Sequence, residues 1–596
     1  MRVFALHSLG WLTLLAACHS LLGCASASEA KAGAEAGGAA GGAQSGPMSA
    51  AGADNAGGQT ASGGGPAAQT GGGSGASGIG VTTSGGASAA AGGSAGGVGG
   101  AAAAGSSIAG GAESGGGSGV GSAGSAGVSS GALIHNDTFW KDTSGTPIYS
   151  QGGGVLKVGD TYYWYGVKYN GAVTYAAKPT GLNSDTSFNA VTCYSSKDLV
   201  SWKFEANVMT QAGSGTEVAG ASWFGRLGVA YNATTKKYVL VSQYSGTAGT
   251  GELFATSSTP TGPFAFDHIQ TVVTNVANST TGDQTVFIDD DGTAYLICSS
   301  SSGRSNLYVA PLHPADYLSV DPATRIFGGP GREGNAMFKY AGHYYFCSSD
   351  LHGWNASHTY CISATNIMGP YGAEFVMTNT DADFSHVTQT GFFITVQGSA
   401  QSTVIFAGDR WADFAGNGLG FNQWMPLTFS GTTPLFQSVT EWSLNAATGA
   451  WSVGPDNNYA LNPSFEADRV AMTQPAGWTT TGTNSNVTGG HTGRWSWQLS
   501  GQANLEQKVA TLPNGTYTLS VWAKSTGGQS LAQIGVSNFG GTTKTVSVSS
   551  ALTTWTQQTI SGVAVSNGQC QIDVTTTGSA TQTVTLDDFS LVRTGP

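Results

Sequence analysis

A strand–turn–strand pattern recurs through the middle of this 596-residue chain and constrains its fold more than any other feature. Each copy places an aromatic or β-branched run before a short turn of Gly, Asp or Asn and a second such run after it. The clearest copies begin at Val155, Gly228, Val286 and Ala336, and a less regular fifth copy covers 402–408. Short runs of this kind, bounded by turn residues, are typical of antiparallel β-hairpins.

Several copies are followed by a second hairpin with its own signature, as in 193–202, 255–264 and 363–371. Two hairpins per unit, repeated roughly every 50–70 residues, predict an all-β, five-bladed β-propeller. A plain β-sandwich is the alternative. It does not require the same pair of hairpins to recur through such a long stretch.

The remaining segments differ sharply in composition. Residues 1–24 read as an export signal, because Arg2 precedes an apolar run too short for a mature membrane span. Residues 25–131 are almost wholly Gly, Ala and Ser, which cannot bury enough apolar surface to fold, so we expect a disordered linker. We expect the propeller in 132–455 and, after a polar break, a jelly-roll β-sandwich in 456–596.

The cysteines bear on cellular location and on cross-linking. The stretches that end at Cys18 and Cys24 resemble bacterial lipoprotein cleavage boxes. We therefore expect an exported protein, either a lipid-anchored protein of the cell surface (outer membrane) or a secreted one. Cys347 and Cys361 lie on successive expected strands and either form a disulfide or act as small buried apolar residues.

Charge is scarce, and this makes single charged residues informative. The net charge of −12 excludes nucleic acid and anionic membrane surfaces as partners, and only 9% of residues are charged. Glu333 stands directly before an expected hairpin, which makes it the candidate for the central catalytic group. The alternative is a solvated charge at a strand end, or a surface ion pair with Arg332. We expect the chain to be a monomer.

Four stretches resemble glycoside hydrolase family 43, and among its branches the exo-β-1,3-galactanases. They are 152–166, 282–292, 332–355 and 408–411. The resemblance implies an exo-acting enzyme that cleaves a plant-type polysaccharide, galactan or arabinogalactan, by an inverting mechanism. It implies no cofactor for catalysis.

The resemblance also assigns catalytic roles. Glu333 matches the general acid, and Asp283 matches the carboxylate that orients this acid and raises its pKa by like-charge repulsion. The Asp that most members use to activate water has no counterpart in 148–152. In the galactanase branch a Gln is thought to position the water, and Gln389 inherits that role. An amide acts there through its imidic form or only by orienting water. The alternatives are a turn cap for Asp283 and a satisfied strand-end amide for Gln389.

Five residues are candidates for substrate binding. Trp354, Trp223 and Trp411 offer rings that can stack on the apolar side of a sugar, with core packing as the alternative. Arg410 lies in the matching stretch 408–411 and Gln151 in 148–152, and both offer hydrogen-bonding groups.

Two departures from the galactanase pattern keep other activities open. Val167 and Gly225 stand where that branch has substrate-binding Glu residues. Lost carboxylates change which hydroxyls are recognised. An α-L-arabinofuranosidase or β-xylosidase of the same family is therefore one alternative, and a propeller that binds glycans without cleaving them is another.

The C-terminal domain looks like a carbohydrate-binding module. Trp478, Trp495 and Trp497 are candidates for its ligand platform, with core packing as the alternative. Glu466 and Asp587 lie near the two ends of the domain, and similar modules hold a structural Ca²⁺ with such oxygen ligands.

Overall fold

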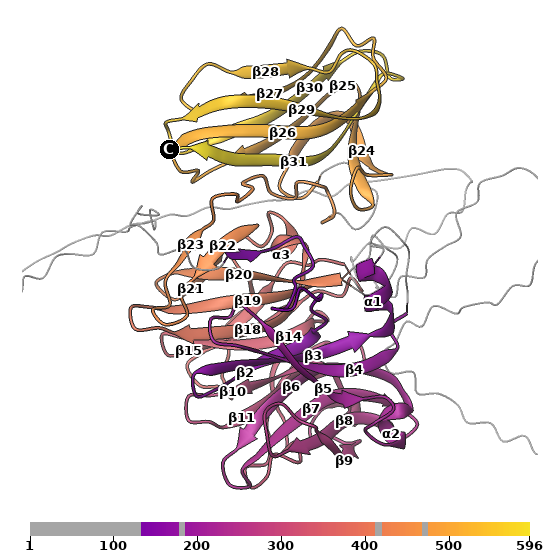
Figure 1. The fold of residues 1–596 in the computed structure, drawn as a ribbon, viewed down its shortest axis with the longest axis vertical. Helices are drawn as coiled ribbons and strands as arrows, with labels where there is room; N and C mark the ends of the chain where they lie inside the picture. Colours follow the sequence, from indigo (N-terminus) through magenta and orange to yellow (C-terminus); the bar gives the residue numbers. More distant parts are fainter. Residues whose placement is uncertain (1–132, 178–184, 354, 412–419, 468–474) are drawn as a thin grey trace, which may run out of the picture. The chain divides into compact units, whose positions relative to one another are not determined.

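The computed structural model describes residues 133–177, 185–353, 355–411, 420–467 and 475–596 (Figure 1). The predicted signal, the linker and Trp354 lie outside these residues. Strands dominate the described chain, which also has a 3₁₀ turn, η1 (Ala277–Ser279), and three short helices: α1 (Asn170–Ala177), α2 (Thr216–Ala219) and α3 (Phe384–Val387). Across these residues, no helix has both the length and the hydropathy that a membrane span requires.

Five four-stranded antiparallel sheets follow one another along the chain, each with its strands in sequence order. The first holds β2 (Gln151–Val158), β3 (Thr161–Tyr169), β4 (Phe188–Ser196) and β5 (Lys203–Thr210). The second holds β6 (Ala221–Asn232), β7 (Lys237–Gly246), β8 (Gly249–Ser257) and β9 (Ala265–Gln270). The third holds β10 (Thr281–Ile288), β11 (Ala294–Ser300), β12 (Asn306–Pro311) and β13 (Thr324–Gly328). The fourth holds β14 (Glu333–Tyr340), β15 (His343–Ser349), β16 (Tyr360–Ala364) and β17 (Phe375–Val376). The fifth holds β18 (Gln389–Gln397), β19 (Ser402–Trp411), β20 (Gly420–Ser430) and β21 (Thr433–Phe436).

A sixth sheet has three strands taken from both ends of this region: β1 (Leu133–His135), β22 (Glu441–Leu444) and β23 (Trp451–Val453). An all-β propeller is therefore confirmed, but the prediction of five blades does not account for the sixth sheet. Its strands have three or four residues each and β1 lies far from its partners in sequence. A search for repeated hairpins therefore misses it.

The hairpins form where the turn residues accept a positive φ. Ala341 and Gly342 connect β14 to β15 with φ of 48° and 75°. Positive φ at both central residues matches the twist of the flanking strands. Cys347 of β15 lies opposite Cys361 of β16, and the two form a disulfide. Among the described residues, Cys193, Cys298 and Cys570 are buried free thiols.

The C-terminal domain is one nearly closed sheet of eight strands (Figure 1). They are β24 (Thr479–Thr488), β25 (Trp495–Val509), β26 (Gly515–Ser525), β27 (Leu531–Ser537), β28 (Lys544–Ser547), β29 (Leu552–Val565), β30 (Cys570–Thr577) and β31 (Thr583–Gly595). The long strand β25 pairs with β31 before Gly501 and with β30 after it. Gly501 has φ of 63°, a conformation that a glycine adopts without strain. Because β25 pairs with different strands on either side of Gly501, it links two parts of the sheet around one apolar core.

Candidate active site

The innermost strands of the five four-stranded sheets bring their first residues together. β2, β6, β10, β14 and β18 lie side by side in this order, and β18 lies next to β2, so the strands close a ring. Each strand has a register shift, near its start in four strands (151–154, 281–284, 333–336 and 390–392) and near its middle in β6 (225–227). Such β-bulges bend a strand and re-aim its side chains. Four of the predicted polar residues lie at or beside these bulges: Gln151, Asp283, Glu333 and Gln389.

Glu333 is the first residue of β14 and is buried. Its Oε1 accepts a hydrogen bond of 2.8 Å from Nε2 of Gln389. Its Oε2 forms an ion pair with Arg304, a residue in the loop after β11. The alternative of an ion pair with Arg332 is wrong, because Arg332 binds Glu374 with two bonds of 2.8 and 2.6 Å. Glu333 is therefore a buried group of the ring and not a solvated strand end.

Asp283 lies in the bulge of the neighbouring strand β10 and reaches Glu333 indirectly. Its Oδ2 accepts a bond of 3.0 Å from the backbone N–H of Gly334, and Arg304 lies 3.4 Å from its Oδ1. Burial raises the pKa of Asp283, but Arg304, Arg226 and the Gly334 N–H outweigh burial, so its pKa lies below the usual value. Arg304 thus pairs with both carboxylates, and its positive charge offsets the like-charge repulsion that we expected between Asp283 and Glu333.

Gln389 is the first residue of β18, and both ends of its amide are bound. Its Nε2 donates to Glu333, whereas its Oε1 accepts from Arg226 and, at 2.9 Å, from Nε1 of Trp411. Because Arg226 and Trp411 fix the oxygen, the amide nitrogen is directed at Glu333. The two predicted catalytic groups therefore touch. An inverting mechanism places its two groups about 6.5–9.5 Å apart with the sugar between them.

The sequence interpretation missed Arg226 and Asp409, which hold this cluster together. Arg226 sits on the bulge of β6 with φ of 47° and is buried. Its guanidinium lies 3.1 Å from Oδ2 of Asp409 and 3.4 Å from Oδ2 of Asp283. Burial raises the pKa of Asp409, and Arg226 only partly offsets this. Part of the signal was present, because both are charged residues in a chain with few charges, Asp409 lies in the matching stretch 408–411 and Arg226 directly follows Gly225.

Gln151 is the first residue of β2 and only 3% exposed. Neither its Nε2 nor its Oε1 has a hydrogen-bond partner among the described residues. Buried side-chain amides without a partner are rare, and each asks for an explanation. The next residue, Gly152, donates its N–H to Asp409 at 3.3 Å, so Gln151 borders the charged cluster. Its amide therefore has unused hydrogen-bonding capacity beside that cluster.

The other predicted substrate-binding residues are more dispersed. Trp223 is half-buried, stacks on Tyr169 and donates from Nε1 to Gln243 at 3.2 Å. Trp411 is 6% exposed, and its ring lies beside the guanidinium of Arg226. Arg410 forms an ion pair of 2.8 Å with Asp137, away from Glu333. Trp411 therefore supports Gln389 and offers little ring surface to a sugar.

The ligand platform that we predicted in the C-terminal domain is wrong. Trp478, Trp495 and Trp497 are 3%, 9% and 0% exposed and belong to the apolar core. Trp495 and Trp497 are two residues apart on β25, so both point to the same face, which is the core face. Two tryptophans that the sequence analysis did not name, Trp522 and Trp555, are half-buried, so part of each side chain is exposed. The ring of His491 stacks on Trp522 at 3.9 Å.

Glu466 and Asp587, the predicted calcium ligands, both bind the loop between β24 and β25. Oε1 of Glu466 accepts from the N–H groups of Arg494 and Trp495 at 2.7 Å, and Oδ2 of Asp587 accepts from the N–H of His491 at 2.5 Å. Burial raises the pKa of Glu466 to about 7; burial and the neighbouring Asp588 raise that of Asp587 to about 9. Within the described chain, no three His, Cys, Asp or Glu residues are grouped to hold a metal.

Comparison with known proteins gives one family and several solved structures. Residues 153–417 match the model of glycosyl hydrolases family 43. No curated protein matches the chain. The exo-β-1,3-galactanase from Phanerochaete chrysosporium with galactose is 22% identical over 77% of this chain and 100% of that chain, with a TM-score of 0.47. The exo-β-1,3-galactanase from Clostridium thermocellum is 21% identical over 78% of this chain and 100% of that chain, with a TM-score of 0.49. The sequence match to the family model places residues 153–417 of this chain in glycosyl hydrolases family 43.

Proposed function

We propose that the propeller is an exo-acting glycoside hydrolase that removes sugars from the ends of galactan or arabinogalactan chains with inversion. Family membership supports hydrolysis of glycosidic bonds. The observation that carries the proposal is the buried carboxyl of Glu333, which contacts Gln389 directly and Asp283 through Arg304. The substrate class rests on the sequence stretches that resemble the exo-β-1,3-galactanase branch.

In this mechanism Glu333 is the general acid. It gives its proton to the glycosidic oxygen as the bond to the anomeric carbon breaks, and water attacks that carbon from the opposite face. Asp283 positions the acid through the Gly334 N–H and Arg304. Gln389 orients the water, and the proton that the water loses passes to the imidic form of the amide or to solvent.

This role requires Gln389 to move away from Glu333 when the sugar enters, because the two groups are in contact without it. A sugar hydroxyl can replace the lost bond on either group. Gln151 supplies a further amide whose hydrogen bonds are unused in the protein. We propose that Gln151 binds a substrate hydroxyl and that Trp223 contacts the sugar ring.

The test is the product that the purified protein releases from β-1,3-galactan. We expect galactose as the only early product, and proton NMR of the fresh product should show the anomer opposite to the linkage cleaved. Longer oligosaccharides as early products would contradict exo action. Retention of the anomeric configuration would contradict the inverting mechanism.

Another specificity or a purely glycan-binding propeller stays a second candidate because of the two departures from the galactanase pattern. Val167 is opposite Gln151 on the neighbouring strand, so no carboxylate stands beside that amide. A Cβ at Gly225 would lie 2.8 Å from the ring of Trp223, so a Glu there requires Trp223 to move. Release of arabinose or xylose, but not galactose, from a panel of plant glycans would establish the other specificity. Binding without any sugar release would establish the lectin-like alternative.

For the rest of the chain we propose the following organisation. The five four-stranded sheets are the catalytic blades, and the three-stranded sheet closes the region by joining its two ends. The C-terminal sheet is a carbohydrate-binding module. Glu466 and Asp587 would hold Ca²⁺ there, because a cation relieves the charge that burial disfavours.

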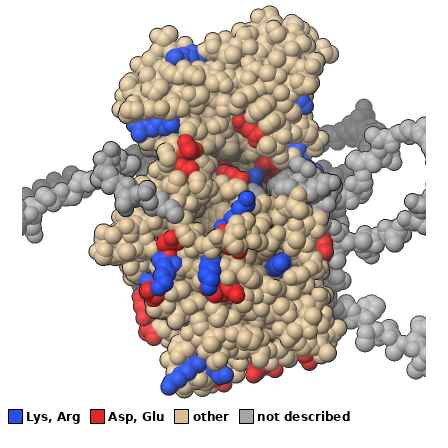
Figure 2. Space-filling model, in the orientation of Figure 1, with Lys and Arg blue, Asp and Glu red and all other residues tan. Residues whose placement is uncertain are grey.

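The N-terminus directs export and lipid anchoring at Cys18 or Cys24, or else secretion. The Cys347–Cys361 disulfide suits an oxidising compartment. Figure 2 shows a face with few charged side chains, which suits a neutral polysaccharide.

A further inference from the structure

The residues just before Gln389 adopt a conformation that L-amino acids avoid. Phe384, Ser385, His386 and Val387 form α3, and their φ values lie between 51° and 58°. A left-handed turn brings each Cβ close to the following carbonyl oxygen, so consecutive residues of this kind need external support. Thr388 ends the turn with extended backbone, and it caps the turn because its N–H donates to the Phe384 carbonyl at 3.1 Å and its hydroxyl to the Ser385 carbonyl at 2.6 Å. Gln389 follows directly.

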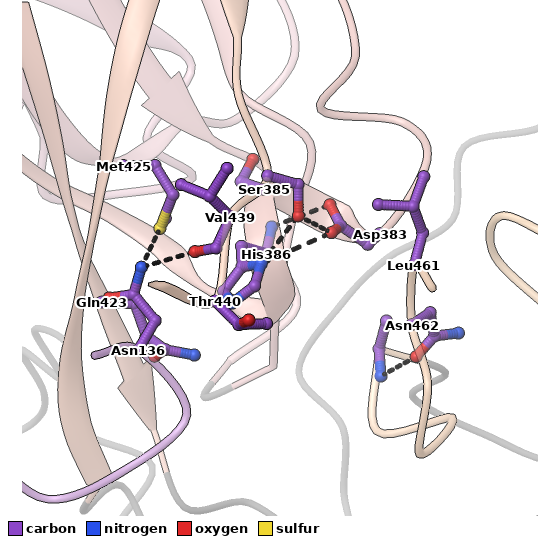
Figure 3. Close-up of polar contacts among 12 residues, drawn as sticks. Asn136, Asp383, Ser385, His386, Gln423, Met425, Val439, Thr440, Leu461 and Asn462 are labelled. Atoms are coloured by element: carbon purple, nitrogen blue, oxygen red, sulfur yellow. Dashed lines mark hydrogen bonds and ion pairs between the residues drawn. The ribbon is translucent and has the colours of Figure 1, made fainter. Parts of the chain in front are cut away.

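The side chain of His386 supplies support from outside the turn through Asp137 and Ser438. Figure 3 shows its ring beside Asp383. The ring is 6% exposed. Its Nε2 lies 3.1 Å from Oδ2 of Asp137, and its Nδ1 lies 2.7 Å from Oγ of Ser438. Ser438 donates its own hydroxyl proton to Oδ2 of Asp383. The Ser438 oxygen therefore accepts from Nδ1, and the carboxylate of Asp137 accepts from Nε2. A histidine that donates from both nitrogens is an imidazolium.

Asp137 connects this ring to a second predicted site residue. Its Oδ1 accepts from Arg410 at 2.8 Å and from Nε2 of Gln423 at 2.9 Å. The charged groups around the imidazolium are thus Asp137 and Asp383, with Arg410 behind Asp137. The imidazolium of His386 therefore belongs to the left-handed turn and also binds Asp137, the partner of Arg410.

We propose that His386 is a positioning residue of the glycosidase site. It ties the segment that follows β1, through Asp137, to the turn that places Gln389, and it fixes Asp137 so that Arg410 keeps its orientation. His386 touches neither Glu333 nor the reacting atoms, and it acts through Gln389. This inference rests on the proposed hydrolytic function.

The first test compares turnover in His386→Gln, which keeps an amide donor but no charge, with Asp137→Asn, which leaves the sequence of the turn unaltered. The control is His313→Gln, because His313 forms a more exposed pair of 3.0 Å with Asp321. We expect kcat on β-1,3-galactan to fall roughly tenfold to a hundredfold in both variants, with KM within about threefold, because small displacements of an orienting group cost turnover. His313→Gln should behave as the wild type.

The second test needs no substrate. Burial lowers the pKa of His386, but Asp137 and Asp383 outweigh burial and raise it to about 10 from 6.5. The stabilisation is therefore complete below pH 6.5 and is lost as the pH rises through about 10. The Tm difference between wild type and His386→Gln should shrink over that range. A constant difference would contradict the assignment of His386 as an imidazolium in the folded protein. A wild type that hydrolyses no galactan overturns the proposed function, whereas an active wild type whose two variants keep full kcat overturns the positioning role alone.

Discussion

The start of the propeller's inner strands and the interior of the C-terminal domain bury opposite kinds of side chain. At the ring, Arg226, Asp283, Glu333 and Asp409 are all at most 8% exposed. The C-terminal core is lined by apolar and aromatic side chains, and its three predicted ligand-binding tryptophans lie within it. Burying a charge is costly unless it is paired, so the ring charges persist only as a network of ion pairs and hydrogen bonds.

The contrast teaches which residues signal function in a chain of this composition. Aromatic residues are what the core of a nearly closed β-sheet requires, so a tryptophan on a strand says little about ligands. A charged residue at the start of an inner strand has no such structural use. In the propeller the buried charged residues mark the candidate site, whereas in the C-terminal domain the predicted tryptophans belong to the core.

Arg226→Met should break the ring network and have the largest effect on stability. It removes the cation that Asp283 and Asp409 share and leaves two buried carboxylates with fewer partners. Losing one partner of a buried ion pair costs about 3–5 kcal/mol of the free energy of unfolding. Calorimetry of the propeller transition measures this loss. Arg332→Met, which separates a less buried pair with Glu374, is the control and should cost less.

Trp497→Ala should have a comparable effect on the C-terminal domain alone. The side chain is fully buried in the apolar core, and truncation of a buried Trp costs about 3–5 kcal/mol. We expect the calorimetric transition of that domain to shift, while kcat on short galacto-oligosaccharides stays unchanged. Trp522→Ala, at a half-buried ring, should leave the transition nearly in place. Equal losses in the two variants would contradict the core assignment.

Gln389→Ala should lower turnover by roughly a hundredfold while galactose affinity changes little, because the amide orients water and contributes little to ground-state binding. Steady-state kinetics and titration calorimetry separate the two quantities. Gln397→Ala, at the exposed far end of the same strand, is the control. A large loss of affinity with unchanged kcat would show that Gln389 binds the sugar.

The last effect we predict is a dependence of the C-terminal domain on pH and calcium. The pKa values of Glu466 and Asp587 are raised to about 7 and 9 in the folded state. The folded domain then binds more protons than the unfolded chain, so its stability falls as the pH rises from about 4 through 9. In a chelator its Tm should be lower at pH 8 than at pH 5, and Ca²⁺ should raise it at pH 8. A Tm at pH 8 that Ca²⁺ does not change would contradict the calcium proposal.

The repeat of hairpins made much of the propeller predictable, and with it the strand starts where Glu333, Gln389 and Gln151 lie. The β-bulges could not be predicted, because a bulge is a property of the pairing between two strands. For the same reason the contact of Arg304 with both Glu333 and Asp283, made across two sheets, left no trace in the sequence. The sixth sheet escaped prediction because β1 and β22 pair although about 300 residues of sequence separate them. In the C-terminal domain, alternation along β25 identified one shared face for Trp495 and Trp497 but not which face is the core.

The most direct test of the account is the turnover of Glu333→Gln beside Glu374→Gln. Both changes remove a carboxylate that pairs with an arginine in the same sheet region, but only Glu333 contacts Gln389. With β-1,3-galactan as substrate, we expect kcat to fall about 10²–10⁴-fold for Glu333→Gln, the usual contribution of a general acid, and by less than about threefold for Glu374→Gln. Full activity of Glu333→Gln, with a folded protein by calorimetry, would contradict the central claim that Glu333 is the proton donor.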